Sequence, residues 1–322
     1  MDSKNTKQSL HLPEEIIEEI LSRLAVKSLL KFRCVSKSWH SLIGCERFVK
    51  KHHQNSTRNT TLAHHRVLLS SRYKVELSQC PLPSLFDKHD TPALKWDFAT
   101  DIFIDSITLV GCCNGLVCIL LNHEHVILWN PSTRISRILP ETPGYKHWFY
   151  GFGCDESSGD YKVIASADEP FVRKNNIAKI YSLKTDSWKE TTGPWELFMT
   201  FRAEQRGMLA SGKLHWEIIS YGIVSFDLKE EVFEIVEESF EEEHFDCAIT
   251  TLAESGIDQL SLMNVQCLFI DVCRESAEVS ACEGLQLIKY STYDYGIHLR
   301  GWEFTEDAYY DCHIYVESLV SP

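Results

Sequence analysis

Two groups of residues carry side chains that metal or nucleophilic chemistry requires. They are three cysteines, Cys112, Cys113 and Cys118, and four histidines, His52, His53, His64 and His65. Zinc sites pair cysteines or histidines at short, fixed spacings such as C-x-x-C, and the sequence contains no C-x-x-C pair. The cysteines lie inside an apolar run, and the histidines have no neighbouring cysteine or carboxylate. We interpret the cysteines as buried strand residues and expect neither a metal site nor a cofactor.

The sequence also lacks the common catalytic motifs. It contains no G-x-S-x-G elbow, P-loop or H-E-x-x-H helix, and Gly151-Phe-Gly153 continues as Cys-Asp-Glu, so the dinucleotide fingerprint fails. The run Glu230–Glu243 holds eight glutamates, a density typical of a solvated face; its functional alternative is steering of a basic partner. We expect no catalytic residue and predict that the chain is not an enzyme.

Charge divides the chain into two parts. The net charge is −14, yet residues 1–60 hold 11 basic and 6 acidic side chains, which leaves a balance of −19 for the remainder. An acidic body argues against nucleic-acid binding, which needs basic groups to displace counterions from phosphates. If this body steers its target electrostatically, the target should be basic.

Targeting signals are not evident in the sequence. Residues 1–11 are polar, without the apolar core of a secretory signal, and no apolar run is long enough to span a membrane. The 12 scattered cysteines are then expected to be reduced thiols, in the cytoplasm or nucleus. A hydrophobic content of 44% is enough for a packed core, which excludes wholesale disorder.

The elements that position these residues begin with a helical unit. One apolar helical stripe is predicted from residues spaced three and four apart: Ile16, Ile17, Ile20, Leu21 and Leu24. Pro13 fits the first turn of this helix. A second helix is predicted over Ser28–Arg33, and a third after Val35 with Ser36 as its N-cap. Three short helices cannot bury all their apolar side chains among themselves, so some must face a partner or the rest of the chain.

This segment resembles an F-box. Leu12-Pro13, Ile16, Ile20, Leu24, Leu29, Phe32, Val35, Ser36 and Trp39 stand at the signature positions of that motif. The resemblance implies binding of a Skp-type adaptor and, through it, a cullin–RING ubiquitin ligase. It implies these adaptor contacts: Leu12, Pro13, Ile16, Ile20, Leu24, Leu29, Phe32, Val35 and Trp39. Four basic side chains are either partners for acidic groups of the adaptor or solvated helix faces: Lys27, Lys31, Arg33 and Lys37. A helical cap packed on the body is the structural alternative.

After a polar stretch at 50–65, expected to be a linker, the pattern becomes that of short strands. Three segments, 126–139, 178–190 and 223–236, share one form: an apolar strand ending on an aromatic, a polar turn and a second strand. The aromatics Trp129, Tyr181 and Phe226 are 52 and 45 residues apart. An upstream strand precedes each aromatic, so every unit has at least three strands. This period is typical of propeller blades.

The strand region resembles the kelch-like F-box-associated domain of plant F-box proteins. The motifs that carry this resemblance are Cys113-Asn114-Gly115-Leu116-Val117-Cys118, Trp129-Asn130-Pro131-Ser132-Thr133, Gly151-Phe152-Gly153-Cys154-Asp155 with Asp160-Tyr161-Lys162-Val163, and Tyr315-Val316-Glu317-Ser318-Leu319-Val320. The fold class expected is a multidomain α+β chain, with a small all-α F-box (8–49), a linker (50–65) and an all-β kelch-like propeller (66–322). Residues 250–313 depart from the repeat, so incomplete or shortened C-terminal blades are expected, and the ring must then either leave an exposed edge or tighten.

The family resemblance implies a substrate-recognition subunit of an SCF-type E3 ubiquitin ligase. Substrates of propellers bind to loops on one face, and three loops here are candidates: Pro140–Trp148, Asp168–Asn176 and Thr192–Arg202. Their aromatic side chains either contact the substrate or pack between blades: Tyr145, His147, Trp148, Trp195 and Phe198. Two alternatives stay open. The chain is an adaptor-binding protein whose degenerate body recruits nothing, or it is a carbohydrate-type ligand-binding propeller.

Overall fold

The architecture is given by a computed structural model. It describes residues 12–71, 75–85, 94–95, 102–141, 147–167, 177–192, 205–218, 222–237, 279–282, 285–288 and 310–322. All structural statements below concern these residues.

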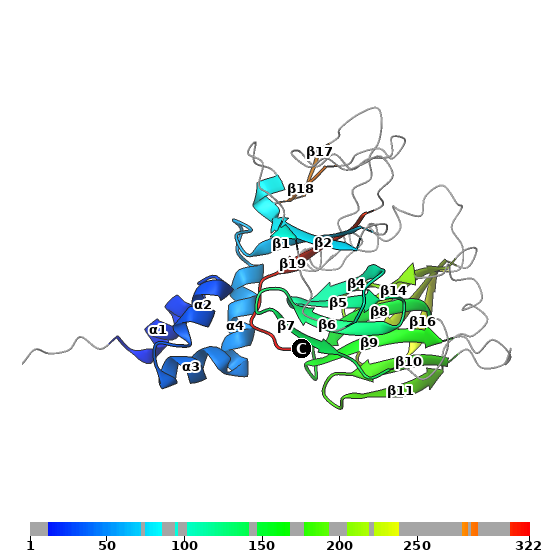
Figure 1. Ribbon diagram of the computed structural model, residues 1–322, viewed down its shortest axis with the longest axis horizontal. Helices are drawn as coiled ribbons and strands as arrows, with labels where there is room; N and C mark the ends of the chain where they lie inside the picture. Colours follow the sequence, from blue (N-terminus) through cyan, green and yellow to red (C-terminus); the bar gives the residue numbers. More distant parts are fainter. Residues whose placement is uncertain are drawn as a thin grey trace, which may run out of the picture.

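The chain begins with four short helices (Figure 1). They are α1 (Glu14–Leu21), α2 (Val26–Phe32), α3 (Lys37–Gly44) and α4 (Glu46–Thr57). Their shared core consists of Leu21, Leu29, Ile43 and Phe48, all buried. Ser36 caps α3 as predicted, because its hydroxyl accepts a hydrogen bond from the backbone N–H of Trp39 at 3.1 Å. Pro13 is the N-cap of α1, one position before the predicted first turn. None of the described helices has the length and apolar character that crossing a membrane requires.

Helix α4 corrects the predicted linker over 50–65. It continues to Thr57 because Phe48, His52 and Ser56 recur every four residues and form one buried face. The polar sequence conceals this helix, since its buried face is built from histidine and serine. Only residues 58–64 then connect the helical unit to the first strand.

The remainder forms four sheets of four or five strands and one of two (Figure 1). In spatial order, the first sheet contains β19 (Tyr310–Val316), β1 (His65–Ser71), β2 (Glu76–Pro81) and β3 (Leu94–Lys95), with the 3-10 turn η1 (Leu82–Leu85) after β2. The second contains β4 (Ile107–Cys113), β5 (Leu116–Leu121), β6 (His125–Asn130) and β7 (Ile135–Ile138). The third contains β11 (Ser187–Thr192), β10 (Ile177–Ser182), β9 (Asp160–Ala167), β8 (His147–Asp155) and β12 (Gln205–Arg206). The fourth contains β13 (Met208–Ala210), β14 (Lys213–Ile218), β15 (Gly222–Asp227) and β16 (Phe233–Glu237), and the small sheet contains β17 (Val279–Cys282) and β18 (Leu285–Ile288).

These four sheets are the blades of a propeller, so the expected fold class is confirmed. Inner strand β4 contacts β19 on one side and β8 on the other, and β8 in turn contacts β13 and β14. The first blade combines the first and last strands of the domain, because β19 pairs antiparallel with β1 from His65↔Val316 to Ser71↔Tyr310. The two-stranded sheet β17–β18 falls in the region where shortened C-terminal blades are expected, and that expectation stays a prediction. Most of the divergent 250–313 region lies outside the described residues.

The three repeated aromatics occupy equivalent places at the ends of β6, β10 and β15. Trp129, Tyr181 and Phe226 are fully buried there. Tyr181 pairs with Trp188, and Phe226 with Phe233, on the strand that follows. In the first repeat the apolar residue comes one position earlier because Ile135 lies opposite Asn130, next to Trp129. The regular spacing of these aromatics in the sequence therefore results from the packing of strands within each blade.

Gly151 and Gly153 on β8 are packing residues. A Cβ atom at Gly151 would lie 2.6 Å from the Trp216 ring, and one at Gly153 would lie 2.6 Å from the Leu228 side chain. The absence of side chains at these two positions lets the third and fourth blades approach closely. Close packing between blades therefore accounts for both glycines, and no nucleotide-binding role is needed to explain them.

Turns in an antiparallel meander alternate between the two ends of its strands, which gives the propeller two faces. The proximal face carries the turns at 113–116, 130–135, 155–160, 182–187 and 227–232, together with residues that follow β19. The distal face carries the turns at 102–106 and 122–125. The helical unit lies against the proximal face, on the left of Figure 1, where α4 contacts β19.

Candidate functional site

The helical unit has an apolar surface that stays exposed among the residues the structure describes. Its exposed side chains are Leu12 at 57%, Ile16 at 47%, Ile20 at 51% and Val35 at 61%. Ile16 and Ile20 are spaced by four residues and therefore share one face of α1, and Leu12 lies two residues before the helix begins. Such a stripe of large exposed aliphatic groups marks an interaction surface. We call Leu12, Ile16, Ile20 and Val35 the α1 surface.

The nine predicted adaptor contacts divide by burial. Pro13 is exposed beside the α1 surface, whereas Leu24, Phe32 and Trp39 are partly buried against the helical core. The rings of Phe32 and Trp39 meet edge to face with centroids 5.6 Å apart. Leu29 is fully buried in that core and offers no area to a partner. It supports the unit from within.

The charged side chains of the helical unit fall into two groups, those exposed to solvent and those paired within the unit. Lys27, Lys31 and Lys37 are exposed, and Arg33 is partly buried. Within the described residues, the acidic side of α1 is bound to α4, as Glu18 accepts from Arg47 at 2.6 Å and from Lys51 at 3.3 Å. The lysines therefore remain available for a partner, while the glutamate fixes the packing of two helices.

The four histidines lie where the helical unit meets the propeller. His52 approaches the carbonyl oxygen of Leu24 at 2.8 Å, and its ring lies 6.1 Å from that of His64. Burial, reinforced by neighbouring His52, lowers the pKa of His53 to about 4, and burial likewise lowers that of His65 to about 4. These imidazoles are neutral at pH 7. Among the described residues, no three histidine, cysteine or acidic side chains form a group able to hold a metal.

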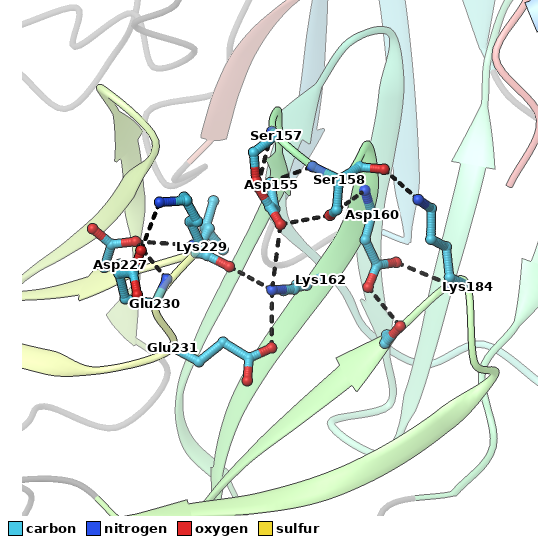
Figure 2. A network of polar contacts seen from close by, with 12 residues as sticks. Asp155, Ser157, Ser158, Asp160, Lys162, Lys184, Asp227, Lys229, Glu230 and Glu231 are labelled. Carbon is cyan, nitrogen blue, oxygen red and sulfur yellow. Dashed lines mark hydrogen bonds and ion pairs between the residues drawn. The ribbon is translucent and has the colours of Figure 1, made fainter.

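A buried lysine joins two blades on the proximal face (Figure 2). Lys162 on β9 donates to the Leu228 carbonyl in the β15–β16 turn and pairs with Glu231 at 2.9 Å, while Asp155 lies 3.9 Å away. Glu231 also pairs with the exposed Lys189. Because the ammonium group is nearly inaccessible, these contacts serve cohesion between blades.

The β8–β9 turn beside Lys162 is also internally satisfied (Figure 2). Asp155 accepts from the backbone N–H of Ser157 at 2.9 Å and from the hydroxyls of Ser157 and Ser158. Burial alone would raise the pKa of this carboxyl, but the hydrogen bonds outweigh it and lower the pKa to about 2. Asp160 accepts from the hydroxyl of Ser182 at 2.6 Å, which ties this turn to the neighbouring one. The carboxylates of this turn are structural.

The glutamate run is described as far as residue 237, and its members there contact lysines. Glu230 pairs with Lys229, and Glu234 pairs with Lys213 at 2.6 Å. Together with Glu231, these side chains neutralise charge within the chain. This part of the run is therefore less available for steering a basic partner than its sequence suggests.

The three clustered cysteines are buried strand residues, as predicted. Cys112 and Cys113 end β4, and Cys118 lies in β5 opposite Gly111. Burial raises the pKa of the Cys113 and Cys118 thiols above their usual range, so both are protonated at neutral pH. The cysteines whose side chains the structure describes form no disulfide bonds.

The strands that precede the three candidate substrate loops, β7, β9 and β11, end on the distal face, away from the helical unit. Most residues of the loops themselves lie outside the described part of the chain. Tyr145, Trp195 and Phe198 lie outside the described residues. His147 and Trp148 begin β8, but their side chains also lie outside the described part. The assignment of these five aromatics to substrate therefore stays a prediction.

Phe103 is a distal residue that the sequence did not single out. Its side chain is 84% exposed. Its backbone is held by Asn122, whose amide donates to the Phe103 carbonyl at 2.6 Å and accepts from the N–H groups of Asp105 at 2.9 Å and Ser106 at 3.3 Å. Asn122 and His123 both have positive φ, in the three-residue turn between β5 and β6. The available signal was an isolated aromatic among acidic residues just before a buried strand.

Comparison with known families agrees with these two units. Residues 9–51 match the F-box domain, and residues 69–290 match the F-box associated beta propeller domain. The chain belongs to the F-box proteins that carry this propeller domain. Both resemblances seen in the sequence are thereby confirmed.

Similar proteins come from Arabidopsis thaliana. An F-box/kelch-repeat protein is 32% identical over 244 residues, covering 69% of this chain and 64% of that protein. F-box protein CPR1 is 31% identical over 258 residues, covering 70% of this chain and 59% of CPR1. The chain spans about half to two thirds of the length of the curated relatives it matches. Among solved structures, apo AztD from Citrobacter koseri matches with a TM-score of 0.32 and 12% identity over 53% of this chain and 45% of AztD, too low to carry an argument.

Proposed function

We propose that this F-box protein is a substrate-recognition subunit of an SCF-type E3 ubiquitin ligase, acting in the cytoplasm or nucleus. The observation that carries the proposal is the α1 surface: four large aliphatic side chains exposed on a well-packed F-box. A Skp-type adaptor would cover them, with Leu24, Phe32 and Trp39 at the edge of the contact. The exposed lysines of α2 and α3 would face acidic groups of the adaptor.

The chain would perform no bond chemistry itself. Its contribution would be proximity, since holding a target lysine near activated ubiquitin converts transfer into an effectively intramolecular step. The distal face, opposite the F-box, is the proposed site of the target. Phe103 and the candidate aromatics Tyr145, His147, Trp148, Trp195 and Phe198 are the proposed contacts there. A basic target remains part of the proposal because the body carries the negative charge.

Adaptor binding is the first test. Changing Ile16→Asp and Ile20→Asp together should weaken capture of a purified Skp-type adaptor by about tenfold or more, because both side chains would leave an apolar contact. Ile235→Asp is the matched control, as Ile235 on β16 is about equally exposed. Circular dichroism should show all variants folded. Failure of folded wild-type protein to bind the adaptor would refute the proposal.

Target recruitment is a separate test. Proximity labelling with and without proteasome inhibition should identify proteins that accumulate near the wild-type chain only when degradation is blocked. Intact adaptor binding without any such protein would favour the alternative of an F-box protein with a degenerate receptor domain.

A further inference from the structure

The segment after β19, residues 317–322, lies between the F-box and the propeller (Figure 1). Leu319 packs against the F-box core, whereas Val320 packs against the core shared by the second and third blades. Ser318, on the other side of Leu319, is fully buried beside Gly115, where even a Cβ atom would lie 2.2 Å from the serine hydroxyl. Successive side chains thus enter different domains, as alternation along an extended chain permits.

The propeller holds this segment by its backbone. The amide of Asn130, at the end of β6, donates to the carbonyl oxygens of Ser318 at 3.0 Å and Val320 at 2.7 Å. Its own oxygen accepts from the N–H groups of Ser132 and Thr133, so the amide is fixed from both ends. Asn130 is itself fully buried. Leu319 is therefore presented to the F-box from a rigid support.

The start of the segment is equally constrained. The Glu317 N–H donates to the His64 carbonyl at 2.9 Å, and its carboxylate accepts from Arg66 at 2.8 Å. Arg66 belongs to β1, the strand that follows the F-box, and His64 lies immediately before it. The chain on entering the propeller and the chain on leaving it are thereby bound together.

Helix α4 supplies a second attachment. Lys50 lies 4.0 Å from where a Cβ of Gly159 would stand in the β8–β9 turn, and His53 interacts with Asn114 in the β4–β5 turn. The opposite side of α4 binds α1 through the Glu18 ion pairs. Two separated attachments resist rotation, which one alone would permit.

We propose that residues 317–322 are a positioning strut, with Leu319 and Asn130 as its positioning residues, that fixes the α1 surface relative to the distal face. This inference rests on the proposed function for its consequence: a fixed orientation sets which target lysines reach the ubiquitin-charged enzyme. The strut acts through geometry alone and leaves adaptor and target contacts unchanged.

The test loosens the strut from each side. Leu319→Ser removes its F-box contact, and Asn130→Ala removes its propeller contact while lying wholly outside the F-box. Ile138→Ser, at an exposed position of the same blade, is the control. The readout is a short amine cross-link between Lys50 on α4 and Lys184, whose ammonium group donates to the Ser158 carbonyl in the turn that Lys50 approaches.

If the strut fixes the two domains, the yield of the Lys50–Lys184 cross-link should fall several-fold in Leu319→Ser and in Asn130→Ala. The double variant should show no further loss, because both changes open the same connection. In the reconstituted ligase, either variant should spread self-ubiquitination over more lysines of the propeller while its adaptor affinity stays unchanged. Wild-type cross-linking in Asn130→Ala would overturn the strut, even if Leu319→Ser proved misfolded. A chain that cross-links as expected but binds no adaptor would keep the strut and refute only the proposed function.

Discussion

The proximal and distal faces of the propeller are built from the same alternating turns, yet they differ in what those turns contact. On the proximal face, Asn130, Asp155 and Lys162 direct their polar groups into the chain: toward the 317–322 strut, the residue's own turn and a neighbouring blade, respectively. On the distal face, the described turn at 102–106 directs its polar backbone toward Asn122 and its phenyl ring toward solvent. The proximal face is therefore built for cohesion, and the distal turn displays a side chain. This contrast predicts that changes on the two faces have different consequences.

The largest expected effect is on the proximal face. Lys162→Met should lower the free energy of unfolding by about 3 kcal/mol, because it leaves the Leu228 carbonyl without its donor and Glu231 without its buried partner. Urea unfolding measures the loss. Lys189→Met is the matched control: Lys189 pairs with the same Glu231 but is mostly exposed, so it should cost less than about 1 kcal/mol. Equal losses in the two variants would contradict a role for burial.

The next effect concerns acid. The pKa of His53 is about 4 in the folded chain, against 6.5 for an exposed histidine. Between these two values the unfolded chain binds a proton at His53 and the folded chain does not. The stability that the neutral His53 imidazole permits is complete above about pH 6.5 and is lost as the pH falls toward 4. The loss for His53 alone reaches on the order of 2 kcal/mol by about pH 5. Unfolding midpoints between about pH 7 and pH 5 measure this, since carboxylates titrate lower.

The matched variants for acid sensitivity are His53→Gln and His40→Gln. The first removes the buried imidazole at the junction and should flatten the pH dependence, although it also costs stability at neutral pH. The second changes an exposed histidine of α3 and should leave the slope unchanged. An unaltered slope in His53→Gln would show that the junction does not exclude the proton.

Sequence alone predicted those parts of the two faces that follow local rules. The Ser36 cap, the strand ends at Trp129, Tyr181 and Phe226, and the exposed stripe on α1 all depend on nearest neighbours and periodicity. Helix α4 was missed because its buried face uses histidine and serine. The strut was missed for a different reason: Asn130 and Ser318 are 188 positions apart, and only the closed blade brings them together.

The assignment of the candidate loops to a substrate stays a prediction, because the structure describes mainly the strands that precede them. Since turns alternate between the two ends of a meander, the strand order alone predicts that β7, β9 and β11 end at the same face. Phe103 was not predicted from the sequence because its position depends on a hydrogen bond from Asn122, a residue on a separate turn. Recognising an exposed aromatic residue on a fixed backbone requires the three-dimensional contacts of that backbone, which the sequence alone does not provide.

The smallest expected effect on stability comes from Phe103→Ala. Its ring is exposed, and Asn122 holds only its backbone, so the free energy of unfolding should change by less than about 0.5 kcal/mol. If the distal face receives the target, the same change should remove proteins that accumulate near the wild-type chain under proteasome inhibition, while adaptor binding persists. Proximity labelling of the two chains side by side measures this.

Asn122→Ala separates the ring from its support. It keeps the phenyl group and the backbone hydrogen bond from Asn122 N–H to the Ser106 carbonyl, but removes the three side-chain hydrogen bonds to residues 103–106. Recruitment should therefore weaken if the target requires the ring on a fixed backbone. Full recruitment by Asn122→Ala together with loss in Phe103→Ala would mean that the ring matters and its rigidity does not. Full recruitment by both would place the target elsewhere on the propeller, and the contrast between the faces would then describe stability alone.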